Sequence, residues 1–343
     1  MTTYLHVGGY THTSPVGIHS FAYRDGTLEP VSTLTGIDHP SWLAAGPDAA
    51  TMYAVSETGD AGTIVALRIE GPGLTPIDER PSHGGAPCHL GITADGVFVA
   101  NYQTGTVAGY AVDLTGRFGR SLGHHQHRGQ GPLPRQTSPH AHCVVPGPDG
   151  RSVYSNDLGT DRIIHYVVDD TGWRPVDETV MPAASGPRHL TFHPALPIAF
   201  AVGELDSSIT VLDLDRGSGR LSPRQTLGTV PDDHDGESTA AEVVVHPDGR
   251  RIYVSNRGHD SIATFAFDAG TGELSLVGHT SSGGRTPRHF ALDPRSELML
   301  VANQESGTIV ALRVDGDAGL PEAIGVVAEV PEPSCVLFVE DPS

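Results

Sequence analysis

The sequence predicts an all-β fold, a seven-bladed β-propeller in which each blade is a four-stranded antiparallel sheet. Three observations predict it: a strand-and-turn unit that recurs through the chain, two motif series of seven copies each, and an offset between those series at the two ends. Repeated units of a few tens of residues are typical of propellers. The whole chain, residues 1–343, is expected to form one such domain.

The repeating unit is clearest between residues 241 and 274. Its predicted strands are, in order, Val243–Val245, Ile252–Ser255, Ile262–Phe267 and Leu274–Val277. The first two are separated by the turn His246-Pro-Asp-Gly, in which Pro presets φ and Gly249 is free to take a positive φ. Short β-branched runs between such turns are typical of antiparallel strands. This unit therefore predicts one blade.

Two motifs recur seven times each. One ends a second strand, as apolar residues, a small residue and then Asn, Glu or a similar residue, with copies ending at Tyr10, Glu57, Asn101, Asn156, Glu204, Asn256 and Asn303. The other precedes each first strand and usually begins with Pro, with copies starting at Pro40, Pro87, Pro139, Pro187, Ala240, Pro287 and Pro333. Since each blade needs one copy of each motif, seven blades are expected.

The two series are offset at the ends of the chain. The chain opens on a second-strand motif with no first strand before it, and it ends on a first-strand motif, 333–340, with no second strand after it. Pairing these ends closes the ring and removes an exposed strand edge that would invite aggregation. We therefore expect the last strand to be the innermost strand of the blade whose other strands come from the N-terminus.

Antiparallel pairing places the Pro motifs and the Asn or Glu strand ends on one face, around the mouth of the central channel. Turns such as 246–249 fall on the opposite face. Two longer connections, 117–138 and 229–241, lead from blade to blade on the mouth face, and each forms either a lid over the channel or a mobile surface loop. Binding and catalytic residues concentrate on loops that a rigid scaffold positions, so we expect function at the mouth.

Charge excludes two classes of partner. The chain has 41 acidic and 21 basic residues, with a formal net charge of −20, and every basic residue is Arg. Nucleic acids and acidic membranes are bound by cationic surfaces, so we expect neither nucleic-acid nor membrane binding. A cluster of arginines inside a cleft of such a chain predicts a small anionic partner, because Arg pairs with carboxylate and phosphate groups.

Cysteine usage and hydropathy predict a cytoplasmic protein. Three cysteines without a CxxC pair predict neither a disulfide scaffold nor a structural zinc site. They stand at first-strand starts, where burial in the core is expected: Cys88, Cys143 and Cys335. No secretion signal or run of roughly 18 apolar residues is expected to direct the chain to a membrane. A monomer and a weak dimer are both compatible with the sequence.

One arc of blades at the mouth departs from simple packing residues. It presents the residues that we predict to be catalytic: His140, His142, Arg188, Glu204 and Arg257. Arg recognises carboxylate or phosphate in a planar, bidentate way, and His and Glu are the usual general acids and bases. Four further residues are predicted to bind the substrate: Arg288, His189, Asn256 and Asn156. No metal and no cofactor is expected.

Structural roles compete with several of these assignments. One histidine recurs at a single register position in three blades, as His89, His189 and His289. The strand-end asparagines recur likewise, as Asn101, Asn156, Asn256 and Asn303. Residues that recur by register are typically hydrogen-bonded to neighbouring strands or loops. A third group forms either a metal-binding cluster or part of a solvated loop: His124, His125 and His127.

The sequence resembles the propeller-type 6-phosphogluconolactonase family, which is related to the fungal carboxy-cis,cis-muconate lactonizing enzymes. The resemblance covers essentially the whole chain and rests on SPHAHCVV (138–145), SNDLGTDRI (155–163), GPRHLTFHP (186–194), GELDS (203–207) and VSNRGHDSI (254–262). It implies a lactone as substrate or product and no metal. The residues that it carries over are His140 or His142, Arg188, Glu204 and Arg257.

Two positions depart from the family pattern. Gly203 stands before Glu204 where the family is expected to have Asn, and the fifth first-strand motif is Ala240-Ala-Glu. Neither departure removes a carried-over residue. The absence of Lys does not exclude a phosphorylated sugar, because Arg alone can hold phosphate.

The leading hypothesis is a lactonase that hydrolyses a sugar-acid lactone, 6-phosphogluconolactone in particular. Arg188 and Arg257 would hold the anionic group and stabilise the oxyanion. Glu204 or His142 would activate the water, and His140 or His142 would protonate the leaving alkoxide. The function would then belong to carbohydrate metabolism.

Three alternatives stay open at this point. One is a lactonizing or isomerising enzyme that acts on an unsaturated polycarboxylate or a specialised metabolite with the same residues. Another is a non-catalytic propeller that serves as a protein-interaction platform. The last is a metal-dependent lactonase, with oxygen ligands from Glu57, Asn156, Glu204 and Asn256.

Overall fold

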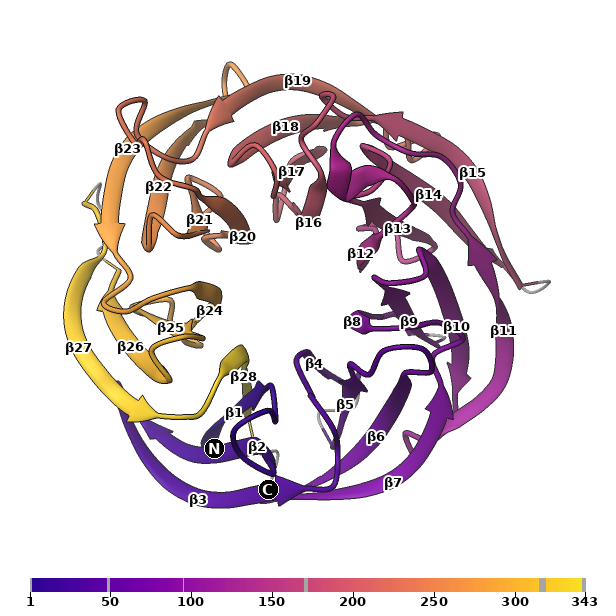
Figure 1. The fold of residues 1–343 in the computed structure, drawn as a ribbon, viewed down its shortest axis with the longest axis vertical. Coiled ribbons are helices and arrows are strands. Elements are labelled where there is room, and N and C mark those ends of the chain that lie inside the picture. The colour runs from indigo at the N-terminus through magenta and orange to yellow at the C-terminus, as the bar shows by residue number, and fades with distance from the viewer. Residues whose placement is uncertain (1, 48–49, 95, 170–171, 315–318, 341–343) are drawn as a thin grey trace.

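Across the residues that it describes, 2–47, 50–94, 96–169, 172–314 and 319–340, the computed structural model is a ring of seven four-stranded antiparallel sheets around a central channel (Figure 1). The predicted fold is therefore confirmed. Within each blade the strands follow one another outward from the channel. No helix of this described part is long and apolar enough to cross a membrane.

The first four blades contain the N-terminal half of the chain together with the C-terminal strand. From the channel outward, blade 1 consists of β28 (Pro333–Glu340), β1 (Thr3–Gly9), β2 (Val16–Arg24) and β3 (Thr27–Thr35). Blade 2 consists of β4 (Leu43–Ala45), β5 (Thr51–Ser56), β6 (Thr63–Glu70) and β7 (Gly73–Pro81). Blade 3 consists of β8 (Pro87–Ile92), β9 (Gly96–Asn101), β10 (Thr106–Val112) and β11 (Phe118–Gln126). Blade 4 consists of β12 (Ala141–Pro146), β13 (Ser152–Asp157), β14 (Arg162–Asp169) and β15 (Gly172–Val180).

The last three blades have the same construction. Blade 5 consists of β16 (Pro187–Phe192), β17 (Ile198–Gly203), β18 (Ser208–Leu214) and β19 (Leu221–Gly228). Blade 6 consists of β20 (Thr239–Val245), β21 (Arg251–Arg257), β22 (Ser261–Asp268) and β23 (Glu273–Ser281). Blade 7 consists of β24 (Pro287–Leu292), β25 (Leu298–Asn303), β26 (Thr308–Arg313) and β27 (Glu322–Glu329). A short 3₁₀ helix, η1 (Pro134–Gln136), lies between β11 and β12.

The two ends of the chain close the ring as predicted. Strand β28 pairs antiparallel with β1, from Thr3 opposite Glu340 to Gly9 opposite Pro333. Strands β28 and β1 lie next to each other on the inner side of one blade (Figure 1). Because β28 is the innermost strand of blade 1, the C-terminal segment is required to complete both that blade and the channel wall.

The hydrophobic core is divided into layers between neighbouring blades. One layer joins blades 5 and 6 through Phe200 and Phe265, and another joins blades 7 and 1 through Leu300 and Leu5. Second strands such as β5 are buried at every residue, whereas the outermost strand β7 is largely exposed or half-buried. Inner strands are covered by neighbouring blades on both faces, which explains their continuous apolar runs.

The predicted connection 117–138 is shorter than expected. Phe118–Gln126 is the outermost strand β11, so the connection that follows it begins at His127. His124 and His125 therefore belong to a strand rather than a lid. An outer strand has one solvated face, and its polar residues made this segment resemble a loop. The other long connection narrows to 229–238, because β20 already begins at Thr239.

The repeat register needs a correction in blades 1, 2, 4 and 5. Strand pairing equates Asn101 with Gly9, Ser56 and Gly203, so Tyr10, Glu57 and Glu204 stand one residue beyond the position that the motif series predicted.

Blade 4 is shifted in the other direction. Asp157, and not Asn156, opposes the first residue of the third strand, as Asn101 and Asn256 do in their blades. Likewise Ala141, and not Pro139, opens β12 and faces the end of the second strand. The predicted register aligned Asn156 with the other asparagines and Pro139 with the other prolines because the residue types are the same. The strand pairing shows that Asp157 and Ala141 are the structural equivalents.

Candidate active site

Three rings of register-equivalent residues surround the mouth end of the channel. The upper ring is the residue at the end of each second strand or directly after it: Tyr10, Glu57, Tyr102, Leu158, Glu204, Arg257 and Gln304. The middle ring is the second residue of each inner-strand motif: Ser334, Ser41, Cys88, His142, Arg188, Ala241 and Arg288. The lower ring is the residue that follows: Cys335, Trp42, His89, Cys143, His189, Glu242 and His289.

A polar cavity of about 160 Å³ lies within the upper two rings. Its lining consists of Glu57, Cys88, Tyr102, Arg135, His142, Glu204, Arg257 and Arg288. All but one of these belong to the rings, and the exception is Arg135, which η1 carries on the connection between blades 3 and 4. Three guanidinium groups therefore face two carboxylates in one small space. In a chain of net charge −20 this is a local concentration of positive charge.

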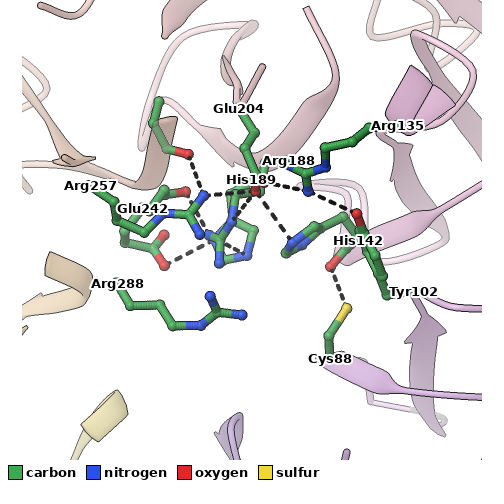
Figure 2. A network of polar contacts seen from close by, with 12 residues as sticks. Cys88, Tyr102, Arg135, His142, Arg188, His189, Glu204, Glu242, Arg257 and Arg288 are labelled. Atoms are coloured by element: carbon green, nitrogen blue, oxygen red, sulfur yellow. Dashed lines mark hydrogen bonds and ion pairs between the residues drawn. The ribbon is translucent and has the colours of Figure 1, made fainter. Parts of the chain in front are cut away.

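Glu204 is the centre of the ion-pair network (Figure 2). Its Oε2 lies 2.9 Å from Arg257 Nη2, 3.1 Å from Arg188 Nε and 3.7 Å from His142 Nε2. Its Oε1 lies 2.9 Å from Arg135 Nη2, which donates a hydrogen bond to it. The residue is only 3% exposed. A carboxylate so deeply buried stays charged only because these cations compensate its lost hydration.

The protonation states in the network follow from burial and charge. Burial by itself raises the pKa of Glu204, but Arg257, His142, Arg188 and Arg135 together outweigh it and hold that pKa well below the usual range. Burial, reinforced by Arg188, holds the pKa of His142 well below 6.5. Glu204 is therefore a carboxylate at neutral pH, and His142 is a neutral imidazole whose buried Nδ1 has no hydrogen-bond partner among the described residues.

The opposite wall of the cavity is a second hydrogen-bonded group. Tyr10 donates a hydrogen bond to Glu57 Oε2 at 3.0 Å, and Ser41 donates to the same oxygen. Arg288 Nη2 donates to the Tyr10 hydroxyl at 2.8 Å, and its guanidinium carbon lies 5.3 Å from the centre of the Tyr10 ring. These contacts hold Arg288 as a cation facing Glu204 and His142 across the cavity (Figure 2).

The lower ring forms a buried floor beneath this cavity. Arg188 Nη1 donates to His189 Nε2 at 3.1 Å, so the neutral imidazole carries its proton on Nδ1 and donates it to Glu242 Oε2 at 2.9 Å. The Trp42 ring stacks on His89 with 4.0 Å between ring centroids and meets His189 edge-on. These aromatic and imidazole rings pack across the channel and support Arg188 from below.

A larger cavity, of about 400 Å³, lies on the turn face between blades 4 and 5. Its lining includes Pro148, Pro194 and Pro197, and Arg216 is its single arginine among the described residues. Volume alone therefore does not identify the site. The mouth cavity is the better candidate because titratable groups with strongly shifted pKa values converge on it.

Comparison with known proteins agrees with this geometry. A profile of the family described as "Lactonase, 7-bladed beta-propeller" matches residues 4–338. The chain belongs to this lactonase family. It is 30% identical over 346 aligned residues to the 6-phosphogluconolactonase of Bacillus subtilis (strain 168), with 99% of each chain covered.

Solved structures of related proteins share the fold over their full length. A protein from Lactobacillus plantarum is 31% identical, with a TM-score of 0.93 and coverage of 99% of this chain and 100% of that one. The periplasmic gluconolactonase PpgL of Pseudomonas aeruginosa is 29% identical, with a TM-score of 0.90 and 100% of both chains covered. The resemblance to the lactonase family noted from the sequence is confirmed.

In this lactonase-family chain the structure brings five of the predicted residues together. Glu204, Arg257 and His142, predicted to be catalytic, and Arg288, predicted to bind substrate, all line the mouth cavity. Arg188 lies directly beneath, in contact with Glu204. The structure shows that these five residues lie close together, whereas their roles in the reaction stay predictions.

Four other predicted residues do not line the cavity. His140 stacks on the Tyr102 ring, with 4.6 Å between ring centroids, and its Nδ1 lies 2.9 Å from the Tyr102 carbonyl oxygen. His189 belongs to the floor. Asn156 is fully buried within β13, one residue before Asp157, which takes the strand-end position of the repeat. Asn256 donates to the Thr229 carbonyl and accepts from its hydroxyl.

In blades 3, 6 and 7 the recurring strand-end asparagine ties the blade to the connection before it. Asn101 donates to the Ser82 carbonyl oxygen and Asn303 to that of Ser282, as Asn256 does to Thr229. In blade 4 Asp157 takes this position, and its carboxylate lies 2.6 Å from Nδ1 of His127 in the preceding connection. The structural reading of this motif is therefore confirmed for Asn101, Asn256 and Asn303.

The histidines at 124–127 do not form a metal cluster in the part of the chain that the structure describes. His127 is buried between Asp157 and the Tyr166 hydroxyl, and His125 lies in β11 near the carbonyl of Trp173. No group of three or more His, Cys, Asp or Glu side chains among the described residues is arranged to hold a metal ion. Independence of the reaction from metal stays a prediction.

Sequence reasoning missed Arg135, Tyr102, Cys88 and Tyr10 as site residues. Tyr10 and Tyr102 occupy the upper-ring position of Glu204, and Cys88 the middle-ring position of Arg188. A complete register comparison would have found these three. Arg135 has no counterpart in the repeat. Its one sequence signal is an Arg that follows Leu-Pro in a long inter-blade connection.

Proposed function

We propose that this protein is a lactonase that hydrolyses a sugar-acid lactone, specifically 6-phosphogluconolactone to 6-phosphogluconate. The observation that carries the proposal is the arrangement of neutral His142 beside ionised Glu204, with Arg257 and Arg288 facing the same cavity. Lactone hydrolysis needs a base for water, cations for the oxyanion and a proton for the leaving alkoxide, and this lining supplies all three.

His142 is the best candidate for the proton transfers. A carboxylate held among three arginines is a weak base, which argues against Glu204 in that role. His142 is neutral and its side chain lines the cavity, so it can take a proton from water as that water attacks the carbonyl carbon. The same imidazolium then protonates the ring oxygen when the C–O bond breaks, and Glu204 stabilises it meanwhile.

The arginines are suited to the negative charge that develops in the reaction. Arg257 and Arg288 line the cavity, and their guanidinium groups are fixed by the Ala240 carbonyl oxygen and the Tyr10 hydroxyl. Preorganised donors of this kind stabilise a tetrahedral oxyanion without reorganising during the reaction. Arg188 is only 3% exposed, which leaves too little of its surface for binding the substrate. We assign it to holding Glu204 in place.

The decisive experiment is a substrate panel. Purified protein, before and after dialysis against EDTA, is assayed with 6-phosphogluconolactone, gluconolactone and a carboxymuconolactone, and the spontaneous rate is subtracted. We expect rapid hydrolysis of the phosphorylated lactone, unchanged by EDTA. A rate equal to spontaneous hydrolysis for every lactone would rule the proposal out, and loss of activity with EDTA would rule out the metal-independent form.

A second candidate is a lactonizing enzyme that acts on a carboxymuconate. The presence of three arginines around one small cavity favours it, because a polycarboxylate needs several cations. The same panel separates the two, since activity with a carboxymuconate and none with sugar lactones would select this reaction.

A further inference from the structure

We propose that Arg135 selects phosphorylated over unphosphorylated lactones by binding the phosphoryl group at the rim of the cavity. The inference rests on the proposed lactonase function and adds a specificity determinant outside the propeller repeat. Three observations carry it: Arg135 contacts Glu204 Oε1 whereas the two buried arginines contact Oε2, a buried anchor fixes its backbone, and it is the most exposed arginine of the network.

Arg135 is the most exposed cation of the network. Arg188 and Arg257 both contact Glu204 Oε2 from buried positions, where water screens their ion pairs least. Arg135 reaches only Oε1, through Nη2. Its side chain is 51% exposed, so this ion pair is screened by water and is weaker than the buried ones. Its guanidinium can therefore contact a substrate anion at little cost.

The connection that carries Arg135 is anchored beside it. Gln136 is fully buried, and its Nε2 donates to the Leu158 carbonyl oxygen at 2.9 Å and to Asp161 Oδ1 at 2.7 Å. Its Oε1 accepts from the Leu133 backbone N–H at 3.2 Å. A residue next to such an anchor is positioned far more rigidly than one on a free loop. Arg135 is thus held over the cavity in spite of its exposure.

Tyr102 fixes the guanidinium from the other side. Arg135 Nη2 donates to the Tyr102 hydroxyl at 2.9 Å (Figure 2). Tyr102 itself stacks on His140. The chain of contacts from His140 through Tyr102 to Arg135 gives His140 a place in the site without contact with the substrate. We therefore treat His140 as a positioning residue for the rim.

The depth of the arginines predicts which end of the substrate they meet. Side-chain exposure rises from 4% for Arg188 to 14% for Arg257 and 51% for Arg135. His142 shares the deep end with 7% exposure, so the lactone carbonyl must enter first. A charged substituent at the far end of the sugar then lies at the rim. Arg is the side chain that best matches a phosphoryl group, through bidentate hydrogen bonds.

The test compares selectivity rather than activity. Arg135→Gln and Arg135→Lys are assayed with 6-phosphogluconolactone and with gluconolactone, and kcat/KM is determined for each. Arg128→Gln is the matched control, because Arg128 is an exposed arginine of the same connection that does not line the cavity. We expect Arg135→Gln to lower kcat/KM about tenfold or more for the phosphorylated lactone and less than threefold for the other. The kcat/KM of Arg135→Lys for the phosphorylated lactone should lie between those of the wild type and Arg135→Gln, since Lys keeps the charge without the bidentate geometry.

The outcomes separate this inference from the proposed function. Equal losses on both lactones, or no loss on either, would overturn the role of Arg135 while leaving the lactonase activity intact. A wild-type protein that hydrolyses neither lactone would overturn both. Inorganic phosphate gives a further readout, because it should inhibit wild type and Arg128→Gln competitively and Arg135→Gln more weakly. Equal inhibition of all three would contradict a phosphoryl site at the rim.

Discussion

At the scale of single residues, the surroundings of Glu204 and His142 fix the protonation state of each. Burial by itself would favour a protonated Glu204, but three arginines hold it ionised, and burial together with the same positive charge keeps His142 neutral. The two groups are thus held in different roles, Glu204 as a fixed charge and His142 as a base. This division is the chemical core of the candidate site.

Replacing His142 tests that division directly. We expect His142→Asn to lower kcat for gluconolactone by about 10²- to 10⁴-fold, with a small change in KM, because a positioned acid–base group contributes that much. His140→Asn is the comparison, since His140 does not line the cavity, and its loss should stay below tenfold on this substrate. Equal losses from the two changes, measured by steady-state kinetics, would argue against His142 as the base.

The pH dependence of the reaction follows from the lowered pKa of His142. A base is active when deprotonated, and a pKa well below 6.5 keeps this imidazole deprotonated throughout the neutral range. We therefore expect kcat/KM, corrected for spontaneous hydrolysis, to be flat between about pH 6 and 8 and to fall only at lower pH. An acid limb centred at pH 7 or above would contradict this assignment.

At the scale of elements, inner strands position the chemistry and one connection completes it. His142, Arg188 and Arg288 each occupy the second position of an inner strand. Each follows a first residue that is paired with the second strand of its blade, at the point where that pairing shifts register. Arg135 instead depends on the Gln136 anchor in η1. Residues on a rigid repeat supply the reaction, and the irregular connection is free to set specificity.

Strand β1 carries a buried histidine that makes the closed ring sensitive to acid. His6 is fully buried, with Nδ1 2.9 Å from Ser20 Oγ and Nε2 without a partner among the described residues. Burial lowers its pKa to about 4. In the unfolded chain His6 has an ordinary pKa of about 6.5, so it binds its proton there first as pH falls. The free energy of unfolding is therefore lost progressively between about pH 6.5 and the folded pKa.

Urea unfolding at two pH values measures that effect. His6 alone should lower the free energy of unfolding by about 2 kcal/mol between pH 7 and pH 5. Other buried histidines add to the total, so the His6→Gln variant is needed to isolate this share. We expect the free energy of unfolding of His6→Gln to fall by about 2 kcal/mol less than that of the wild type between pH 7 and pH 5. An identical drop in wild type and variant would show that His6 does not contribute.

At the scale of the whole molecule, ring closure decides whether seven marginal sheets become one stable domain. Each core layer lies between two blades, so no blade buries its apolar faces alone. The layer between blades 7 and 1 depends on β28, which supplies Val336 at 1% exposure. The channel mouth exists only when this last strand is paired.

A charged residue in the closing strand should therefore prevent folding. Val336→Asp places an unpaired carboxylate in the core, and we expect a loss of more than about 4 kcal/mol, enough to abolish a cooperative thermal transition. Val326→Asp in β27 is the matched control, because that valine is 56% exposed, and it should shift the melting temperature little. Similar melting curves for the two variants would contradict the importance of closure.

Much of this architecture could be predicted because the repeat carries its own register. The two motif series and their offset at the ends predicted seven blades and the pairing of β28 with β1, since strand patterning and turn chemistry are local properties. The same register predicted that Arg188, Glu204, Arg257 and Arg288 lie at the mouth. It could not predict which of these side chains form ion pairs with one another.

The sequence by itself therefore determined the ring, its closure and the blades on which charged residues meet. The tertiary structure decided what could not be local: that Asp157 rather than Asn156 takes the repeat position, that His140 supports Tyr102, and that Arg135 enters the site. These outcomes depend on contacts between segments far apart in the chain. Burial and the charges of neighbouring blades fix them, and neither is encoded in the few residues around any one position.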